Sequence, residues 1–170
     1  MLAGMSDTSL RRGRDADLGA LVAIYNHYVR ETAVTFDLEP YTEEGRRPWL
    51  RPFAEGGRYQ LFVAERAGAV VGYACSRRFR DKAAYDTTLE TSVYLAPEAC
   101  GGGLGRALYE RLLAALAGVD AHRLVAGITL PNPASVALHE RLGFAPVGVM
   151  REVGRKLGRY WDVLWMERAL

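Results

Sequence analysis

The chain has 170 residues, of which 49% are apolar and 25% charged, and its formal net charge is +2. This length and composition suit one globular domain. The small, evenly spread charge excludes a basic nucleic-acid-binding surface, and no Cys/His spacing resembles a zinc site. No apolar run approaches the ~20 residues of a membrane-spanning helix. The sequence therefore predicts no nucleic-acid partner, no membrane insertion and no metal.

The N-terminal residues show no apolar core followed by a cleavage site, so we predict no signal peptide. Met1 and Met5 are alternative starts. Residues 1–9 are predicted to be a flexible tail, followed by a single domain over residues 10–170. Cys75 and Cys100 form neither a disulfide framework nor a metal motif, so we expect a reduced, cytoplasmic protein.

Four strands and one long helix are predicted in the first 96 residues. The helix has apolar side chains at helical spacing, with Asp15 or Asp17 available as its N-terminal cap. The proline-rich segment after it is typical of a broken helix with loops, and Ala-Gly-Ala between two strands is typical of a tight turn. The elements are a strand at 8–14, a helix at 15–32, the broken segment at 37–59, and strands at 59–66, 70–79 and 87–96.

Helices and strands alternate in the second half of the chain. Asn132 is predicted to cap one of these helices, with Pro133 in the first turn and Gly143 just past its end. The whole pattern predicts a mixed sheet with helices on both faces and no internal repeat. The elements are helices at 104–118 and 131–144 and strands at 123–130, 144–156 and 160–170.

Glycines gather between the strand at 87–96 and the helix at 104–118, in the segment Cys-Gly-Gly-Gly-Leu-Gly-Arg at 100–106. A helix N-terminus presents unpaired N–H groups, and glycine lets a phosphate approach them closely. A flexible turn is the alternative. The P-loop and the dinucleotide-binding fingerprint do not fit, because the lysine–hydroxyl pair and a glycine at Leu108 are missing.

The helix at 131–144 offers polar side chains to the same region. Asn132, Ser135 and His139 are three and four residues apart, so they share one helix face. Leu138 and Leu142 lie beside them and are predicted at the edge of the core. Two helices that each follow a parallel strand would then flank one groove, one with N–H groups and the other with side chains.

These motifs in this order resemble the GNAT superfamily of acyl-CoA-dependent N-acetyltransferases, over nearly the whole chain from about Leu10. The superfamily's pyrophosphate loop falls on residues 100–105 and its later Asn-x-x-Ser motif on residues 132–144. The stretches YNHYVRETAVTFD, AYDTTLETSVYLAP, LPNPASVALHERLGFAPVG and GRKLGRYWDV are similar to its phosphinothricin acetyltransferase branch. The resemblance implies an α/β (α+β) fold with a mixed, mostly antiparallel sheet of about seven strands and about four helices. It also implies acetyl-CoA as cosubstrate, a small-molecule amine as acceptor, and a homodimer.

Strand alternation places Glu90, Ser92 and Tyr94 on one face, and a carboxylate facing an apolar cleft can act as a general base. A surface ion pair is the alternative for Glu90. The resemblance favours catalysis by Glu90 and by His139, as acid or base. Predicted cofactor contacts are Val93, Tyr94, Leu95, Gly101, Gly102, Gly103, Leu104, Gly105, Arg106, Asn132 and Ser135, and predicted acceptor contacts are Phe36, Arg77, Arg80, Lys82, Tyr85 and Ser92, beside the aromatic segment 159–163.

Two departures from the family pattern concern anion binding. Cys100 and Gly101 replace the polar and basic residues that open the pyrophosphate loop, which removes a cationic contact with CoA. Arg80 and Lys82 exchange the order seen in the herbicide-resistance enzymes, and the two side chains are not equivalent at a bidentate anion site. The preferred acceptor anion is therefore open.

The cationic residues suit a carboxylate-bearing acceptor such as phosphinothricin, methionine sulfoximine or methionine sulfone. One alternative is a GNAT enzyme that acts on a peptide N-terminus or an ordinary amino acid, since a basic cluster disfavours only polyamines. Another is a non-catalytic acyl-CoA-binding sensor. Glu90 and His139 together argue against a sensor, which has no use for a paired base and acid.

Overall fold

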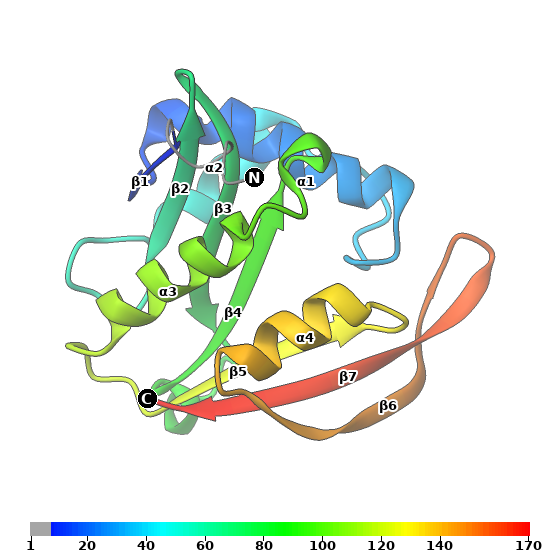
Figure 1. Ribbon diagram of the computed structural model, residues 1–170. Helices are drawn as coiled ribbons and strands as arrows, with labels where there is room; N and C mark the ends of the chain where they lie inside the picture. Colours follow the sequence, from blue (N-terminus) through cyan, green and yellow to red (C-terminus); the bar gives the residue numbers. More distant parts are fainter. Residues whose placement is uncertain (1–7) are drawn as a thin grey trace.

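The computed structural model describes residues 8–170, so the choice between Met1 and Met5 lies outside the described residues. A seven-stranded sheet runs in the order β1-β2-β3-β4-β5-β7-β6. Neighbouring strands are antiparallel except β4 and β5, which are parallel. Together with four α-helices, this arrangement confirms the predicted mixed, mostly antiparallel α/β fold (Figure 1).

Most elements begin and end within about three residues of their predicted bounds. The predicted broken segment contains one short helix, α2, and the predicted tight turn joins β2 to β3. The strands are β1 (Thr8–Arg12), β2 (Leu61–Arg66), β3 (Ala69–Arg78), β4 (Thr88–Leu95), β5 (Arg123–Thr129), β6 (Ala145–Lys156) and β7 (Arg159–Ala169), and the helices are α1 (Leu18–Glu31), α2 (Glu43–Leu50), α3 (Leu104–Leu116) and α4 (Pro133–Arg141).

Two features near the N-terminus refine the predictions. The first strand begins at Thr8, as predicted, and it pairs with β2, so Thr8 and Ser9 belong to the sheet. Asp17 is the N-cap residue of α1, one of the two predicted, but its side chain does not cap the helix, because the carboxylate accepts hydrogen bonds from the Arg11 guanidinium and from the Arg14 N–H, each at 2.8 Å. The Arg11 contact holds the pKa of Asp17 below its usual value.

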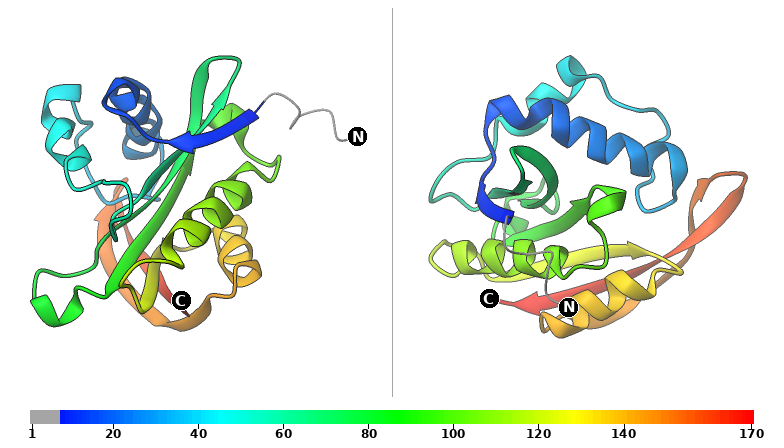
Figure 2. Two further views of the ribbon diagram at one scale, coloured as in Figure 1. Left: turned by 90° about the vertical axis from the view of Figure 1, so that its left-hand side faces the viewer. Right: turned by 45° about the horizontal axis from the view of Figure 1, so that its top comes forward.

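The helices form two layers around the sheet. Figure 2 shows α1 and α2 on one face and α3 and α4 on the other. Phe62, Val63 and Ala64 of β2 are consecutive and all fully buried, as expected for a strand covered on both faces. Leu138 and Leu142 pack at the edge of this core, as predicted.

The sheet opens between β4 and β5. These strands pair only across Thr88–Glu90 and Arg123–Val125, whereas β4 stays paired with β3 to its end and β5 stays paired with β7 to its end. The chain therefore has two blocks of strands, β1–β4 and β5–β7, that diverge from a short shared ladder (Figure 1). This divergence creates the space described below.

Within residues 8–170, no helix combines the length and apolar character needed to cross a membrane. In the same part of the chain, no three His, Cys, Asp or Glu side chains lie together as a possible metal site. Cys75 is buried and Cys100 is exposed, and both are free thiols.

Candidate active site

The space between the diverging strands, here called the β4–β5 cleft, is bordered by main-chain groups. Ala96 N donates to Val71 O at 2.9 Å, and antiparallel alternation then turns the peptide groups of Val93 and Leu95 away from β3. These N–H and carbonyl groups point toward β5, in the part of the sheet where β4 and β5 are no longer paired. The cleft is lined by Val34, Thr91, Ser92, Val93, Tyr94, Ala126, Gly127, Ile128, Thr129, Asn132, Ser135 and His139.

The glycine loop leads into α3, and no side chain caps the start of this helix. Gly101 and Gly103 have φ values of +84° and +80°, a backbone conformation that favours glycine, and Gly103 is the N-cap residue. A Cβ atom placed on Gly102 or Gly103 would meet no atom within 4 Å, so the surface above the loop is open. The first-turn N–H groups of α3 are therefore available to an anion.

The first turn of α3 lies between the end of β4 and α4. A Cβ atom on Gly105 would stand 3.6 Å from a Leu95 methyl carbon and 3.7 Å from one of Leu138. The two helices thus flank the same edge of the sheet, as the spacing of the motifs predicts. Arg106 is exposed and pairs within the helix with Glu110 at 2.7 Å.

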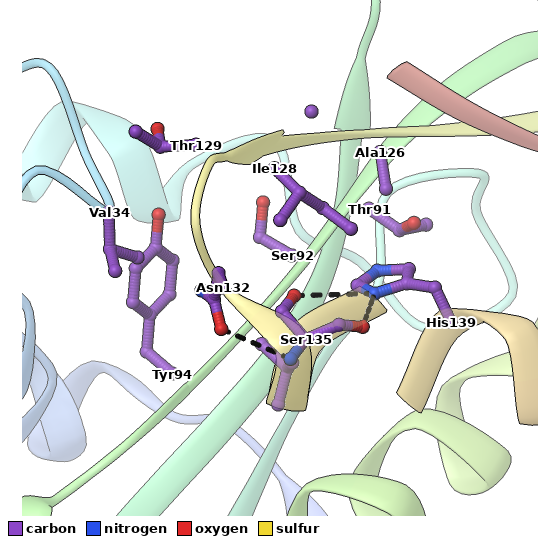
Figure 3. A pocket seen from close by; sticks show the side chains of 12 residues that line it. Val34, Thr91, Ser92, Tyr94, Ala126, Ile128, Thr129, Asn132, Ser135 and His139 are labelled. Carbon is purple, nitrogen blue, oxygen red and sulfur yellow. Dashed lines mark hydrogen bonds between the residues drawn. The ribbon is translucent and has the colours of Figure 1, made fainter. Parts of the chain in front are cut away.

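Helix α4 presents its polar side chains to the cleft (Figure 3). Asn132 caps the helix as predicted, since its side-chain oxygen accepts a hydrogen bond from the Ser135 N–H at 3.1 Å. His139 Nδ1 lies 2.8 Å from the Ser135 carbonyl oxygen and 3.4 Å from the Ser135 hydroxyl. Three of the predicted site residues therefore lie together on one face.

His139 is only 4% exposed and belongs to a buried hydrogen-bond chain. Because a carbonyl only accepts, Nδ1–H donates to Ser135 and Nε2 accepts from the Tyr109 hydroxyl at 3.0 Å. Tyr109 in turn lies 2.5 Å from Thr91 Oγ1, which then acts as the donor. Burial lowers the pKa of His139, so the ring is neutral near pH 7.

A second space, here called the hairpin cavity, adjoins the cleft on the α1 side of the sheet and has a volume of about 360 Å³. It shares Val34, Ser92, Tyr94, Gly127 and Thr129 with the cleft, so the two spaces meet between β4 and β5. The hairpin cavity is lined by Tyr25, Val34, Thr35, Phe36, Arg77, Glu90, Ser92, Tyr94, Gly127, Thr129, Met150, Val153, Val163 and Trp165.

Glu90 carries the carboxylate of the hairpin cavity. It stands directly across the β3–β4 ladder from Arg77. Burial raises the pKa of Glu90, and the attraction of the Arg77 charge only partly offsets this effect. The site therefore holds a carboxylate that accepts a proton more readily than a surface glutamate.

The predicted acceptor residues divide into two groups. Phe36, Arg77 and Ser92 line the hairpin cavity, whereas Arg80, Lys82 and Tyr85 do not. The latter three are exposed on the loop after β3. The Arg80 guanidinium carbon lies 4.9 Å from the Phe79 ring and 5.9 Å from the Tyr85 ring. Phe79 packs on Trp165, so this loop borders the cavity from outside.

Several residues that line the site are not predicted from the sequence. Tyr109 shares the apolar face of α3 with Leu108 and Leu112, so its hydroxyl is hidden among core residues in the pattern. No sequence motif in the loop after α1 or in the β6–β7 hairpin indicates that these two segments are in contact. The unpredicted residues are Tyr25, Val34, Thr35, Thr91, Tyr109, Ala126, Gly127, Ile128, Thr129, Met150, Val153 and Trp165.

Comparison with known proteins agrees with this geometry. A model described as the acetyltransferase (GNAT) family matches residues 21–144. The chain is 53% identical over 171 residues to the phosphinothricin N-acetyltransferase of Streptomyces coelicolor, covering 99% of this chain and 100% of that protein. It is 36% identical over 162 residues to an L-methionine sulfoximine/L-methionine sulfone acetyltransferase of Salmonella typhimurium. This match covers 95% of this chain and 94% of that protein. Among solved structures, the chain matches a GNAT superfamily phosphinothricin acetyltransferase from Sinorhizobium meliloti in complex with acetyl-CoA. The TM-score is 0.91 and the identity 34%, and the match covers 96% of this chain and 89% of that chain.

Proposed function

Because the chain belongs to the acetyltransferase (GNAT) family, we propose that it transfers the acetyl group of acetyl-CoA to the α-amine of a small amino-acid-like acceptor. The proposed acceptors are phosphinothricin, methionine sulfoximine and methionine sulfone, the compounds named for its relatives. The single observation that carries this proposal is the meeting of the cleft and the hairpin cavity between β4 and β5, beside Glu90.

The residues of the cleft fit acetyl-CoA. The open surface above Gly102 and Gly103 and the uncapped start of α3 suit a pyrophosphate. The outward peptide group of Val93 and the N–H of Leu95 suit the amides of a pantetheine arm, while the Leu95 carbonyl oxygen accepts from the Tyr28 hydroxyl. Acetyl-CoA supplies a thioester whose carbonyl carbon is open to attack by an amine.

We assign Glu90 the removal of a proton from the acceptor ammonium or amine, directly or through one water molecule. Its raised pKa brings its basicity closer to the working pH, which favours general base catalysis. An N–H group from the end of β4 would stabilise negative charge on the carbonyl oxygen during attack. Attack forms the amide C–N bond and breaks the C–S bond, and the departing thiolate takes up a proton.

His139 has both ring nitrogens in hydrogen bonds and a lowered pKa, so its imidazolium form is disfavoured at neutral pH. This argues for a neutral polar residue, or a base, and against an imidazolium acid. The Ser135 hydroxyl at the cleft is suited to donate a hydrogen bond to the departing thiolate, whose proton comes from water or from the proton that the acceptor amine loses.

Arg77 is the proposed anchor for the acceptor carboxylate, since a guanidinium binds a carboxylate with two parallel hydrogen bonds. Phe36 and Trp165 would enclose the acceptor side chain. Arg80, Lys82 and Tyr85 would act only from the rim, because they lie outside the cavity lining.

The homodimer is also a proposal, and β6 supplies a surface for it. This strand ends the sheet and exposes Val147 at 61% and Met150 at 48%. An exposed apolar edge strand is a natural surface for self-association. Light scattering coupled to size-exclusion chromatography tests this proposal, and a monomer at micromolar concentration contradicts it. Cytoplasmic location likewise stays a prediction, which cell fractionation checks.

The test of function is release of free CoA thiol from acetyl-CoA in the presence of different amines. The panel holds phosphinothricin, methionine sulfoximine, methionine sulfone, ordinary amino acids, spermidine and an acidic peptide. We expect release with the first three and loss of release in Glu90→Gln. Release only with the peptide or spermidine would keep the enzyme class and reject the acceptor. Tight acetyl-CoA binding without release for any amine would favour a sensor.

A further inference from the structure

Lys156, at the end of β6, is a buried cation away from both spaces of the site. It is one of only two lysines in a chain with 22 basic residues, and it is 5% exposed. Its ammonium group donates to the Thr35 carbonyl oxygen at 2.7 Å and lies 3.5 Å from the Tyr28 carbonyl oxygen. A buried ammonium is costly unless its donors find acceptors, and here two main-chain carbonyl oxygens accept from it.

These contacts join the two blocks of the sheet at their open end. Lys156 belongs to the β5–β7 block, whereas α1 packs on β3 and β4 of the other block. The ladder between the blocks holds only three residue pairs, at the closed end of the cleft. Figures 1 and 2 show the β6–β7 hairpin beside the end of α1, across the opening.

Tyr28 extends this link to the strand that borders the cleft. Its carbonyl oxygen faces Lys156, and its hydroxyl donates to the Leu95 carbonyl oxygen at 2.7 Å. A path of polar contacts thus runs from β6 through α1 to the end of β4. The cleft is bridged on its open side by this path.

The loop after α1 is held at a second point by packing. The Phe36 ring lies against the backbone of Gly154, where an added Cβ atom would stand 2.0 Å from a ring carbon. Phe36 and Thr35 line the hairpin cavity, and Lys156 does not. The ammonium group therefore acts on the cavity only through the loop that it holds.

We propose that Lys156 is a positioning residue that fixes the loop 32–37 against the β6–β7 hairpin and so sets the width of the acceptor site. This inference rests on the proposed function, because the site it shapes is the acceptor site. A lysine suits the position since its compact ammonium reaches two carbonyls on different segments, whereas the planar guanidinium of arginine needs a wider, forked arrangement.

The test combines hydrogen exchange with steady-state kinetics of Lys156→Met. We expect amides of residues 33–37 to exchange at least about tenfold faster, while acetyl-CoA affinity stays within about twofold. The acceptor specificity constant should fall roughly ten- to hundredfold, because small misplacement of reacting groups is expensive. Arg155→Met is the matched control, since this exposed neighbour stacks on Tyr160 and should change neither measurement.

The exchange measurement needs no turnover, so it tests the inference even if the wild-type protein transfers no acetyl group. Unchanged exchange at residues 33–37 would overturn the inference. Faster exchange throughout the core strands would also overturn it, because Lys156 would then serve general stability. If Lys156→Met does not fold, Lys156→Gln keeps one short N–H donor, and the same selective change is expected in the loop.

Discussion

The β4–β5 cleft and the hairpin cavity meet between β4 and β5, but they are formed by different kinds of chemical group. The cleft depends on main-chain groups, at the edge of β4 and the start of α3, together with one contiguous motif on α4. The cavity depends on side chains from α1 and the loop after it, and from the strands β3, β4, β5, β6 and β7. A main-chain surface tolerates substitution around it, whereas a surface of side chains changes with each substitution. We infer that the cleft fixes the common acetyl donor and the cavity selects the acceptor.

The two regions also differ in their titratable groups. His139, in the cleft, has both nitrogens bonded and a pKa lowered by burial. Glu90, in the cavity, has a pKa raised by burial and only Arg77 as an opposing charge. Burial thus favours the neutral form of each, but only the carboxylate faces the acceptor. Proton transfer should therefore depend more on the cavity than on the cleft.

Glu90→Gln should have the largest effect on catalysis and should act through the cavity alone. We expect kcat to fall by about 10²- to 10⁴-fold, the usual loss when a general base is removed. Acetyl-CoA affinity, measured by calorimetry, should stay unchanged because the glycine loop is untouched. A fall in acetyl-CoA affinity that parallels the fall in kcat would contradict the division between the two regions.

The same substitution should stabilise the protein at high pH. Since the folded-state pKa of Glu90 is raised, its contribution to stability is complete below the unfolded value of about 4.3 and is lost as pH rises through the folded value. Glu90→Gln removes this loss. Urea unfolding of both proteins at pH 4 and pH 8 checks the sign: the advantage of the variant should appear only at pH 8.

The cleft was largely predictable from the sequence because its parts are contiguous. Glycines before a helix, and Asn132 with Ser135 and His139 at helical spacing, need no tertiary information to be read. The cavity was not predictable in the same way. Nothing in the local sequence around Phe36 shows that its ring packs on Gly154, because that contact depends on how the hairpin crosses α1.

The end of strand β3 explains why the positions of Arg80 and Lys82 were not predictable. Arg77 alternates onto the cavity face of β3, but the strand ends at Arg78, and after that point alternation no longer determines where a side chain lies. The grouping of Arg80 and Lys82 with Arg77 therefore rests on their charge and on the resemblance, and not on strand alternation. The structure separates them from it.

Gly154→Ala should damage the cavity and spare the cleft. An added methyl group would overlap the Phe36 ring at 2.0 Å, and such overpacking costs about 1–3 kcal/mol of unfolding free energy. The displaced ring should also raise the acceptor KM. The double variant with Phe36→Leu should recover part of the stability, and additive effects in this double-mutant cycle would contradict direct contact.

Gly103→Ala is the matching change in the cleft and should have a smaller effect. Alanine at φ +80° costs about 1 kcal/mol, and the strain lies at the first turn of α3. We expect about tenfold weaker acetyl-CoA binding with an unchanged acceptor KM. Gly68→Ala is the control, because Gly68 has the same φ of +80° and open surroundings in the β2–β3 turn. Equal loss of acetyl-CoA affinity in both variants would remove the glycine loop from the cofactor site.

Arg80→Gln should produce the smallest effect and marks the outer limit of the cavity. The Arg80 side chain is exposed and rests on Phe79 and Tyr85, so its charge is screened by solvent. We expect the acceptor KM to change by less than about threefold, a difference below 1 kcal/mol, and to depend on salt. Arg77→Gln should raise the same KM much more, since Arg77 lines the cavity opposite Glu90. The acceptor KM of both variants should be measured at low and high salt. An equal, salt-insensitive rise in KM would mean that the loop after β3 closes over the bound acceptor and that the cavity extends to Arg80.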